Sequence, residues 1–574
     1  MHFRSLLGLI PTLVVGHQTR RFFCHSHILT LPHRTNTTNI DSITMSAAST
    51  AFASLPFTAD FRRRQLQLAF DELKGNEEKL KELNQRFNLN ATATSFQTFV
   101  EPFEQSDWLT SSTDLSTFLD HLDSVGLLPW SETRLRWDWT ETELRSLGAE
   151  IVQRSKRVFD EIAALKQGEH TFDNTVGAYD ANDRIVDHWA STIEFLSNVS
   201  ASQSIRDCSN QLKKELSEFQ VSQQMRVDLF ESFDAFAASE EAKATTGESA
   251  RLIEFTLRDF KRNGLHLPIE QRKRVEEIKK KMSNLGIEFS KNLGEEKSTY
   301  DFSKDELGGI PEDQLSRYSK STSDPSKYSV SLKYPDYFPL MKMCHVAATR
   351  EKMFQHYSQK CMKENKPILE ELINLRGEQA ALLGFPTHAA YILDIRMAKS
   401  PETVDTFLND LSRQLTPLME EELEFWRKIK VDDMKSRGES VPDGEVVIQP
   451  YDVLYLTRLS ELIKYQVDDE AIKKYFPIEV VTKGLLDIYQ QALSLIFEEV
   501  KDRPAYAVWH EDAQLFRVLD VDTRKLRGYF YLDMYPRDGK YGHAAVWPLM
   551  PGCEKNKKGE RQLPVCGMAS QQLE

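Results

Sequence analysis

Apolar residues recur at helical spacing over long stretches of this 574-residue chain. The clearest pattern lies at 271–291, where five apolar residues advance by three or four positions: Val275, Ile278, Met282, Leu285 and Phe289. Residues with this spacing fall along one face of an α-helix, and we expect that face to be buried. Similar patterns predict helices through most of 135–308 and again over 349–383.

Alternation typical of β-strands occurs at few places. It appears at 328–334, and two runs at 515–519 and 528–532 flank a polar turn and predict a hairpin. Segment 562–568 predicts one more strand, whereas the proline, glycine and lysine residues of 548–558 predict a loop. The chain is therefore expected to be mainly α, with a small β-sheet near its C-terminal end.

Composition limits the classes of partner. Hydrophobic residues make up 40% and charged residues 28%, as in globular proteins, and the net charge of −14 disfavours nonspecific binding to nucleic acid or anionic lipid. The basic residues of 271–291 are interspersed with glutamates and indicate a solvated helix face. No apolar stretch reaches about 18 residues, so we expect no membrane span. The pattern indicates no particular oligomeric state.

The N-terminal composition differs from the rest. Residues 1–40 contain no Asp or Glu but four arginines: Arg4, Arg20, Arg21 and Arg34. This is typical of a mitochondrial transit peptide, which we place at 1–44. Two alternatives are a secretory signal using the apolar run 6–15, which lacks a clear cleavage pattern, and a cytoplasmic form starting at Met45.

The residues with metal-binding or nucleophilic chemistry form no recognisable motif. The six cysteines are scattered, which indicates a reducing compartment, and Cys553 and Cys566 lack the second close pair of a zinc site. A helical zinc site needs two histidines four residues apart, and none of the fourteen histidines has that partner. The nearest fragment starts at His510, with Gln514 in place of the second histidine. We therefore predict no catalytic residue and no metal ligand in this chain.

Several short segments, in order along the chain, resemble the thimet oligopeptidase and neurolysin family of zinc metallopeptidases. They are Leu135-Arg-Trp-Asp138, Lys156-Arg-Val-Phe159, Lys261-Arg-Asn-Gly-Leu-His-Leu-Pro268, Leu332-Lys-Tyr-Pro-Asp-Tyr-Phe-Pro339, Lys342-Met-Cys-His-Val346, Tyr475-Phe-Pro477, Trp509-His-Glu-Asp512 and the stretch Gly528 to Ala545. The resemblance implies a mainly helical, two-lobed peptidase with a deep, narrow channel that admits short peptides. It also implies a Zn²⁺ cofactor.

The resemblance places the family's H-E-x-x-H helix, its later glutamate ligand and its assisting tyrosines and histidine beyond Glu574. Within the chain it points to Gly542, His543 and Ala544 as part of an edge strand that pairs with a peptide backbone. The alternative for these three residues is a purely structural strand end. Cys361 falls in a region that the family links to thiol sensitivity, and its alternative is a buried, inert thiol.

The patterns and the resemblance together imply four regions: a transit peptide at 1–44, a helical N-terminal extension at 45–134, an N-terminal helical lobe at 135–330 and a partial metallopeptidase catalytic domain at 331–574. Two functions remain open. The first is a zinc oligopeptidase that cleaves short peptides by resemblance, although we expect these 574 residues alone to be inactive. The second is a non-catalytic form that binds peptides or a full-length partner.

Overall fold

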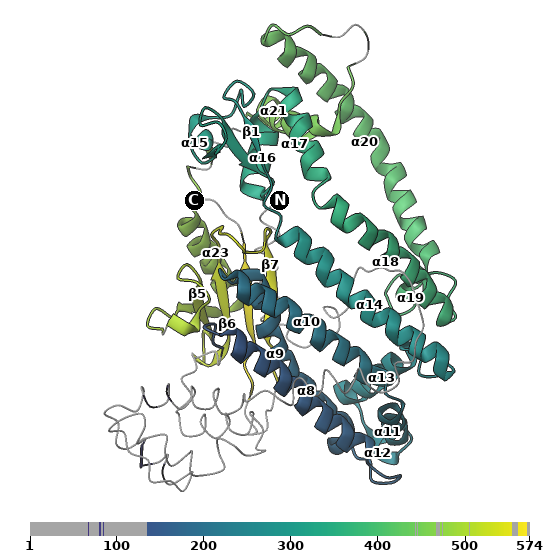
Figure 1. Ribbon diagram of the computed structural model, residues 1–574. Helices are drawn as coiled ribbons and strands as arrows, with labels where there is room; N and C mark the ends of the chain where they lie inside the picture. The colour runs from purple at the N-terminus through teal and green to yellow at the C-terminus, as the bar shows by residue number, and fades with distance from the viewer. Residues whose placement is uncertain are drawn as a thin grey trace.

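The computed structural model describes residues 67, 70, 80, 81 and 84 and then residues 135–574, except 442–443, 445, 467–470, 473, 504, 554–560 and 571–574. The predicted transit peptide at 1–44 lies outside the described residues, as does nearly all of the predicted extension at 45–134. The described part is mainly helical and ends in a small sheet, so the predicted fold class is confirmed (Figure 1).

The α-helices follow one another closely through the first two thirds of the described chain. They are α8 (Glu141–Ala163), α9 (Ala178–Val199), α10 (Gln203–Gln224), α11 (Val227–Ala237), α12 (Glu240–Ala244), α13 (Gly247–Arg262), α14 (Ile269–Gly294), α15 (Glu312–Leu315), α16 (Tyr334–Met343), α17 (Ala347–Ser358), α18 (Met362–Leu382), α19 (His388–Leu393), α20 (Pro401–Ser436), α21 (Val453–Tyr465) and α23 (Ile478–Leu493). Short π and 3₁₀ turns occur at Asp173–Gly177, Pro450–Asp452 and Ala505–Ala507.

The strands form two sheets. They are β1 (Thr299–Phe302), β2 (Ser319–Lys320), β3 (Tyr328–Ser331), β4 (Leu495–Glu499), β5 (Gln514–Asp520), β6 (Leu526–Asp533), β7 (Ala545–Met550) and β8 (Val565–Ala569). The first three make a small sheet in the order β1-β3-β2, and the other five make a sheet in the order β4-β5-β6-β8-β7.

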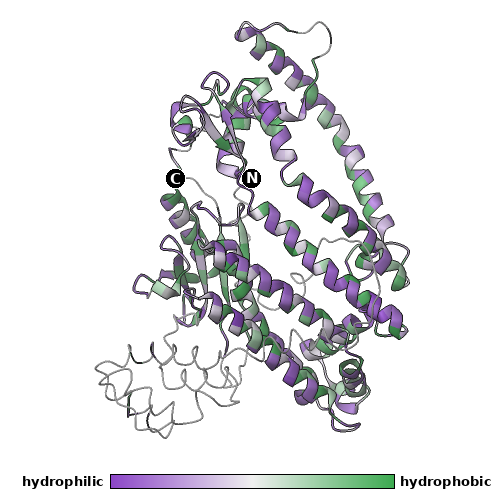
Figure 2. Ribbon diagram, viewed as in Figure 1, coloured by the Kyte–Doolittle hydropathy of each residue, from purple (hydrophilic) through white to green (hydrophobic). Residues whose placement is uncertain are grey.

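Helix α14 confirms the prediction for 271–291. Val275 and Ile278 are buried, and Met282, Leu285 and Phe289 pack against a cluster that includes residues of α18. Helix α14 lies between α10 and α18, as Figure 1 shows. In Figure 2 apolar and polar residues interleave along the long helices, as expected where one face is buried and another is solvated. None of the helices in the described ranges is both long enough and apolar enough to cross a membrane.

The predicted hairpin is confirmed, because β5 and β6 pair antiparallel with Phe516 opposite Phe530. The strand predicted at 562–568 is confirmed as β8, which runs parallel to β6. The loop predicted at 548–558 is wrong at its start, because Pro548 lies inside β7. Strand β7 is the outermost of its sheet, and an edge strand tolerates a residue that lacks an N–H donor.

The strand predicted at 328–334 is shorter than the sequence pattern suggests. Strand β3 ends at Ser331, and α16 begins at Tyr334 with Pro335 in its first turn. Proline fixes a backbone angle that suits the first turn of a helix. The last residue of the alternating run, Tyr334, therefore begins α16 and does not extend β3.

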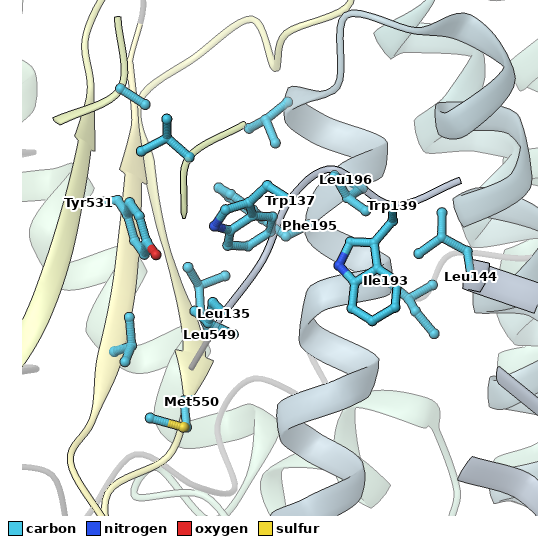
Figure 3. Close-up of a cluster of buried hydrophobic side chains, with 14 of the residues drawn as sticks. Leu135, Trp137, Trp139, Leu144, Ile193, Phe195, Leu196, Tyr531, Leu549 and Met550 are labelled. Atoms are coloured by element: carbon cyan, nitrogen blue, oxygen red, sulfur yellow. The ribbon is translucent and has the colours of Figure 1, made fainter. Parts of the chain in front are cut away.

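The largest core joins the five-stranded sheet to the first helices. Trp137 packs edge-on against Phe195 of α9 and Tyr531 of β6, with ring centroids 5.3 and 5.9 Å apart. Figure 3 shows these rings together with Leu549 at the end of β7. Burial of large aromatic side chains on this scale stabilises the contact between sheet and helices, and it fixes the position of β6 and β7 relative to α9.

Candidate functional site

The three predicted substrate neighbours lie at the entrance to the edge strand. Gly542 and His543 form an exposed bend, and Ala544 immediately precedes β7, so the strand itself begins one residue later than these positions. Strand β7 has β8 on one side and is the last strand on its other side. Within the described ranges, no backbone hydrogen bond reaches the outer side of β7.

The segment between β6 and β7, residues 534–544 and here the β6–β7 loop, is organised by the carboxylate of Asp533. This side chain has no solvent exposure. Lys540 Nζ donates to Asp533 Oδ1 at 2.7 Å, and Arg537 donates to both oxygens at 2.9 and 2.6 Å. Trp509 Nε1 donates to Oδ2 at 2.6 Å. The loop thus folds back on the strand that precedes it.

Lys540 also fixes the backbone of the loop. Its Nζ, which is fully buried, donates to the carbonyl oxygens of Asp533 at 3.1 Å and Tyr535 at 2.6 Å. A buried ammonium needs such acceptors, because the loss of hydration would otherwise disfavour the charged form. The loop backbone therefore cannot move away without leaving the charge unsatisfied.

The electrostatic balance at Asp533 favours the charged carboxylate. Burial alone raises the pKa of this carboxyl, but the hydrogen bond from Arg537 and the charges of Lys540 and Arg537 outweigh burial and hold the pKa below its ordinary value. The carboxylate is therefore ionised throughout the physiological range, and the network keeps its full set of charges.

Three neighbouring elements hold the loop from outside. Tyr541 N donates to Asn198 O of α9 at 2.7 Å, and Asp538 pairs with Lys333, next to α16, at 2.8 Å. Gly539 has a φ of +76° and lies directly against the guanidinium of Arg206, a buried residue of α10. Only glycine suits both the left-handed backbone and the close approach.

The aromatic side chains next to the loop have defined contacts. Tyr541 meets Trp547 of β7 edge-on at 5.3 Å between ring centroids, and Trp547 in turn meets Phe195 at 5.4 Å. The ring of His543 lies 6.1 Å from that of Tyr334 on α16. The exposed bend is therefore flanked by aromatic surface, which suits contacts with a peptide side chain.

The described residues do not fit the zinc ion that the resemblance implies. The fragment starting at His510 is not helical: His510 Nδ1 accepts a hydrogen bond from the Asp512 amide at 3.3 Å, and Gln514 begins β5 and donates to Glu499 at 3.0 Å. Across the ranges that the structure describes, no group of three or more His, Cys, Asp or Glu side chains is placed to hold a metal.

The thiols of Cys361 and Cys566 both have a raised pKa. Burial and the neighbouring Glu296 carboxylate raise the pKa of Cys361 to about 11, and its Sγ donates to Asn292 O at 3.2 Å. Burial raises the pKa of Cys566, within β8, to about 12. Thiolates are the reactive form, so the raised pKa favours the inert alternative for Cys361.

The sequence analysis missed Asp533, Arg537 and Lys540, although all three lie in the Gly528–Ala545 stretch that it singled out. The sequence did contain a signal for these three residues. Asp533 follows a run of buried strand residues, and two basic residues come four and seven positions later. The spacing alone, however, does not show that the chain turns back on itself.

Comparisons with known proteins agree with the resemblance. Residues 340–571 match Peptidase family M3. The chain is 36% identical to a thimet-like oligopeptidase of Dictyostelium discoideum, over 76% of this chain and 65% of that protein. It is 34% identical to saccharolysin of Saccharomyces cerevisiae, over 72% of this chain and 58% of that protein. Oligopeptidase A of Escherichia coli is 28% identical over 69% of this chain and 58% of its own length. The chain thus spans about three fifths of the length of these relatives.

Replacing Asp533 by Ala should loosen the β6–β7 loop. The change leaves Lys540 and Arg537 buried without their acceptor, which costs about 3–5 kcal/mol in comparable buried ion pairs. Hydrogen exchange at the Tyr541 and Ser570 amides, both held next to this network, should accelerate strongly. Unchanged protection of these two amides would contradict this role for Asp533.

The same network predicts that the stability of the folded chain falls at acid pH. The pKa of Asp533 is lower in the folded chain than in the unfolded chain, so its stabilisation is complete above the unfolded value of about 4 and is lost as pH falls through the lower folded value. The difference in thermal midpoint between the wild type and Asp533→Asn should therefore shrink below pH about 4. A difference in thermal midpoint that stays constant at every pH below about 4 would contradict this.

Gly539 and Gly542 form a matched pair. Gly539→Ala places a Cβ against the Arg206 guanidinium at positive φ, whereas a Cβ at Gly542 meets nothing within 4 Å. We expect Gly539→Ala to lower the thermal midpoint and Gly542→Ala to leave it unchanged. Equal midpoints for the two variants would show that the loop does not pack tightly on α10.

The purified 574-residue chain should retain no stoichiometric zinc after dialysis, because its described residues offer no set of ligands. Elemental analysis of the dialysed protein measures this directly. About one tightly bound zinc per chain would show that a ligand set exists after all.

Proposed function

Because residues 340–571 match peptidase family M3, we propose that the chain takes part in oligopeptide hydrolysis and that it binds short peptides along the outer edge of β7. The observation that carries this proposal is the outermost strand β7, whose outer side receives no backbone hydrogen bond within the described ranges and whose entrance is fixed by the buried network around Asp533. The relatives named oligopeptidases support a peptide as the ligand.

An edge strand binds an extended peptide through its backbone. The N–H and C=O groups on its open side supply hydrogen bonds that do not depend on the peptide's sequence, and neighbouring side chains supply preference. Pro548 has no N–H, so it weakens pairing in the second half of β7. The first half of the strand and the bend at 542–544 are therefore the best place for a peptide.

Rigidity of this entrance favours binding. A peptide that adds to a fixed strand loses its own freedom but does not have to order the protein as well. The contacts from Asp533, Arg206 and Asn198 provide this order before a peptide arrives. The exposed bend at Gly542 and His543 then presents its backbone groups in one arrangement.

The alternative function is binding without cleavage. It is favoured by one observation: no H-E-x-x-H occurs in the 574 residues, and the described side chains hold no metal-binding group. A quenched fluorescent peptide, assayed with and without added zinc, separates the two. Zinc-dependent cleavage would show that this chain is itself an enzyme, and binding without cleavage supports the alternative.

Gly542→Pro should weaken peptide binding, because proline removes one N–H donor from the entrance to the edge strand. The expected loss is about three- to tenfold in Kd, which corresponds to one hydrogen bond. Gly542→Ala keeps the donor and has room for its Cβ, so it serves as the control. Fluorescence polarisation of a labelled short peptide measures both variants. Equal affinity for the two variants would place the peptide elsewhere.

A further inference from the structure

A cavity of about 620 Å³, here the α13 cavity, lies between helix α13 and the segments that follow α18 and α19. Three of its lining residues, Glu254, Leu257 and Lys261, are three and four positions apart, so they share one face of α13. Leu383 and Phe385 line it from the other side, and they pack with Leu257 in one apolar cluster. The volume is in the range of sites that bind small molecules.

Two cations in the wall of the α13 cavity already have partners. Arg258 donates to Asp259 Oδ1 at 2.9 Å. Arg262 pairs with Asp394, and its guanidinium lies 4.4 Å from the centre of the Tyr391 ring. The charges of both arginines are therefore compensated within the wall itself.

Glu254 and Lys261 differ from these arginines. Both are exposed, and neither side chain has a hydrogen bond or an ion pair with another residue in the described ranges. They are seven positions apart, so about 10.5 Å separates them along the helix axis. His266, which also lines the cavity, points its Nδ1 at the Lys261 carbonyl oxygen, 3.2 Å away. The cavity thus has an apolar middle between one carboxylate and one ammonium.

The distance between these two charges selects the class of ligand. A molecule that pairs with both must carry an ammonium and a carboxylate roughly 10 Å apart, with apolar groups between them. An extended tripeptide with free termini has this length, because each residue spans about 3.3–3.6 Å. We infer that the α13 cavity binds a tripeptide with apolar side chains and free termini.

Other occupants satisfy the cavity less well. An uncharged apolar molecule, or an apolar stretch inside a longer chain, would take Glu254 and Lys261 out of water and offer neither a partner. A tripeptide pairs with both through its own termini. The α13 cavity shares no residue with the β6–β7 loop or with β7, so this inference does not rest on the proposed function.

Saturation-transfer NMR of the 574-residue chain with Leu-Leu-Leu tests the inference. The leucine methyl groups should receive saturation from the protein, and a titration gives Kd. The same peptide with an acetylated N-terminus and an amidated C-terminus lacks both charges, and it should bind about fivefold more weakly. Gly-Gly-Gly lacks the apolar side chains and should show no binding.

Charge reversal tests the two named residues. Lys261→Glu should weaken the binding of Leu-Leu-Leu about tenfold, because attraction of the terminal carboxylate becomes repulsion. Adding Glu254→Lys should restore most of the affinity, since the charges are then exchanged and the tripeptide binds in the opposite direction. A purely structural effect of the first substitution would not be restored by the second.

Lys156→Glu with Glu231→Lys is the matched control. These residues of α8 and α11 are also exposed, lie outside the cavity and undergo the same change of charge. The control should bind Leu-Leu-Leu as the wild type does. Circular dichroism of all variants checks that they stay folded.

Four outcomes would overturn the inference. In the first, the methyl groups receive no saturation. In the second, the capped peptide binds as tightly as the free one, so the termini are not recognised. In the third, Glu254→Lys does not restore the affinity that Lys261→Glu loses. In the fourth, Gly542→Pro weakens the binding of Leu-Leu-Leu, which would place the tripeptide at β7 instead.

Discussion

The carboxylate of Asp533 is closed off from solvent, so all of its hydrogen bonds must come from the protein. Two cations and an indole satisfy it, and two of these donors come from the loop that follows its own strand. A buried charge with this many partners tolerates little movement. Each hydrogen bond that it loses leaves the cost of removing the carboxylate from water less well compensated, which destabilises the fold. The position of the edge strand's entrance depends on this constraint.

The constraint works because the sheet is itself anchored. Trp137, Phe195 and Tyr531 join β6 to α9, and the loop then reaches α9 and α10 through Tyr541 and Gly539. Apolar packing sets where the sheet lies, and the charged network sets the course of the backbone at its end. A rigid edge beside a solvated bend is the result, and it suits the binding of an extended peptide.

Much of this fold was predictable from local patterns. The buried face of α14 and the pairing of β5 with β6 follow from periods of about 3.6 and 2, because each depends mainly on near neighbours in the chain. Pro548 led to the wrong prediction of a loop at the start of 548–558. A proline can lie in a strand when that strand is at the edge of its sheet, and whether β7 is an edge depends on the order of all five strands.

The candidate site was predictable in part. The stretch that contains Gly542, His543 and Ala544 was found by resemblance, and these residues lie just before the outermost strand, β7, and not within it. The role of Asp533 could not be foreseen, because it needs Trp509 from another segment and a loop that turns back.

A second buried carboxylate allows a direct test of the central claim, which is that the Asp533 network prepares the edge of β7 for a peptide. Asp452 is equally enclosed, and it accepts hydrogen bonds from Arg350 at 2.6 Å and Lys430 at 2.7 Å in a network of other residues. The measurement is the peptide affinity of Asp533→Asn and Asp452→Asn at a temperature where both remain folded. The account predicts weaker binding for Asp533→Asn alone. Equal affinities for the two variants would contradict it.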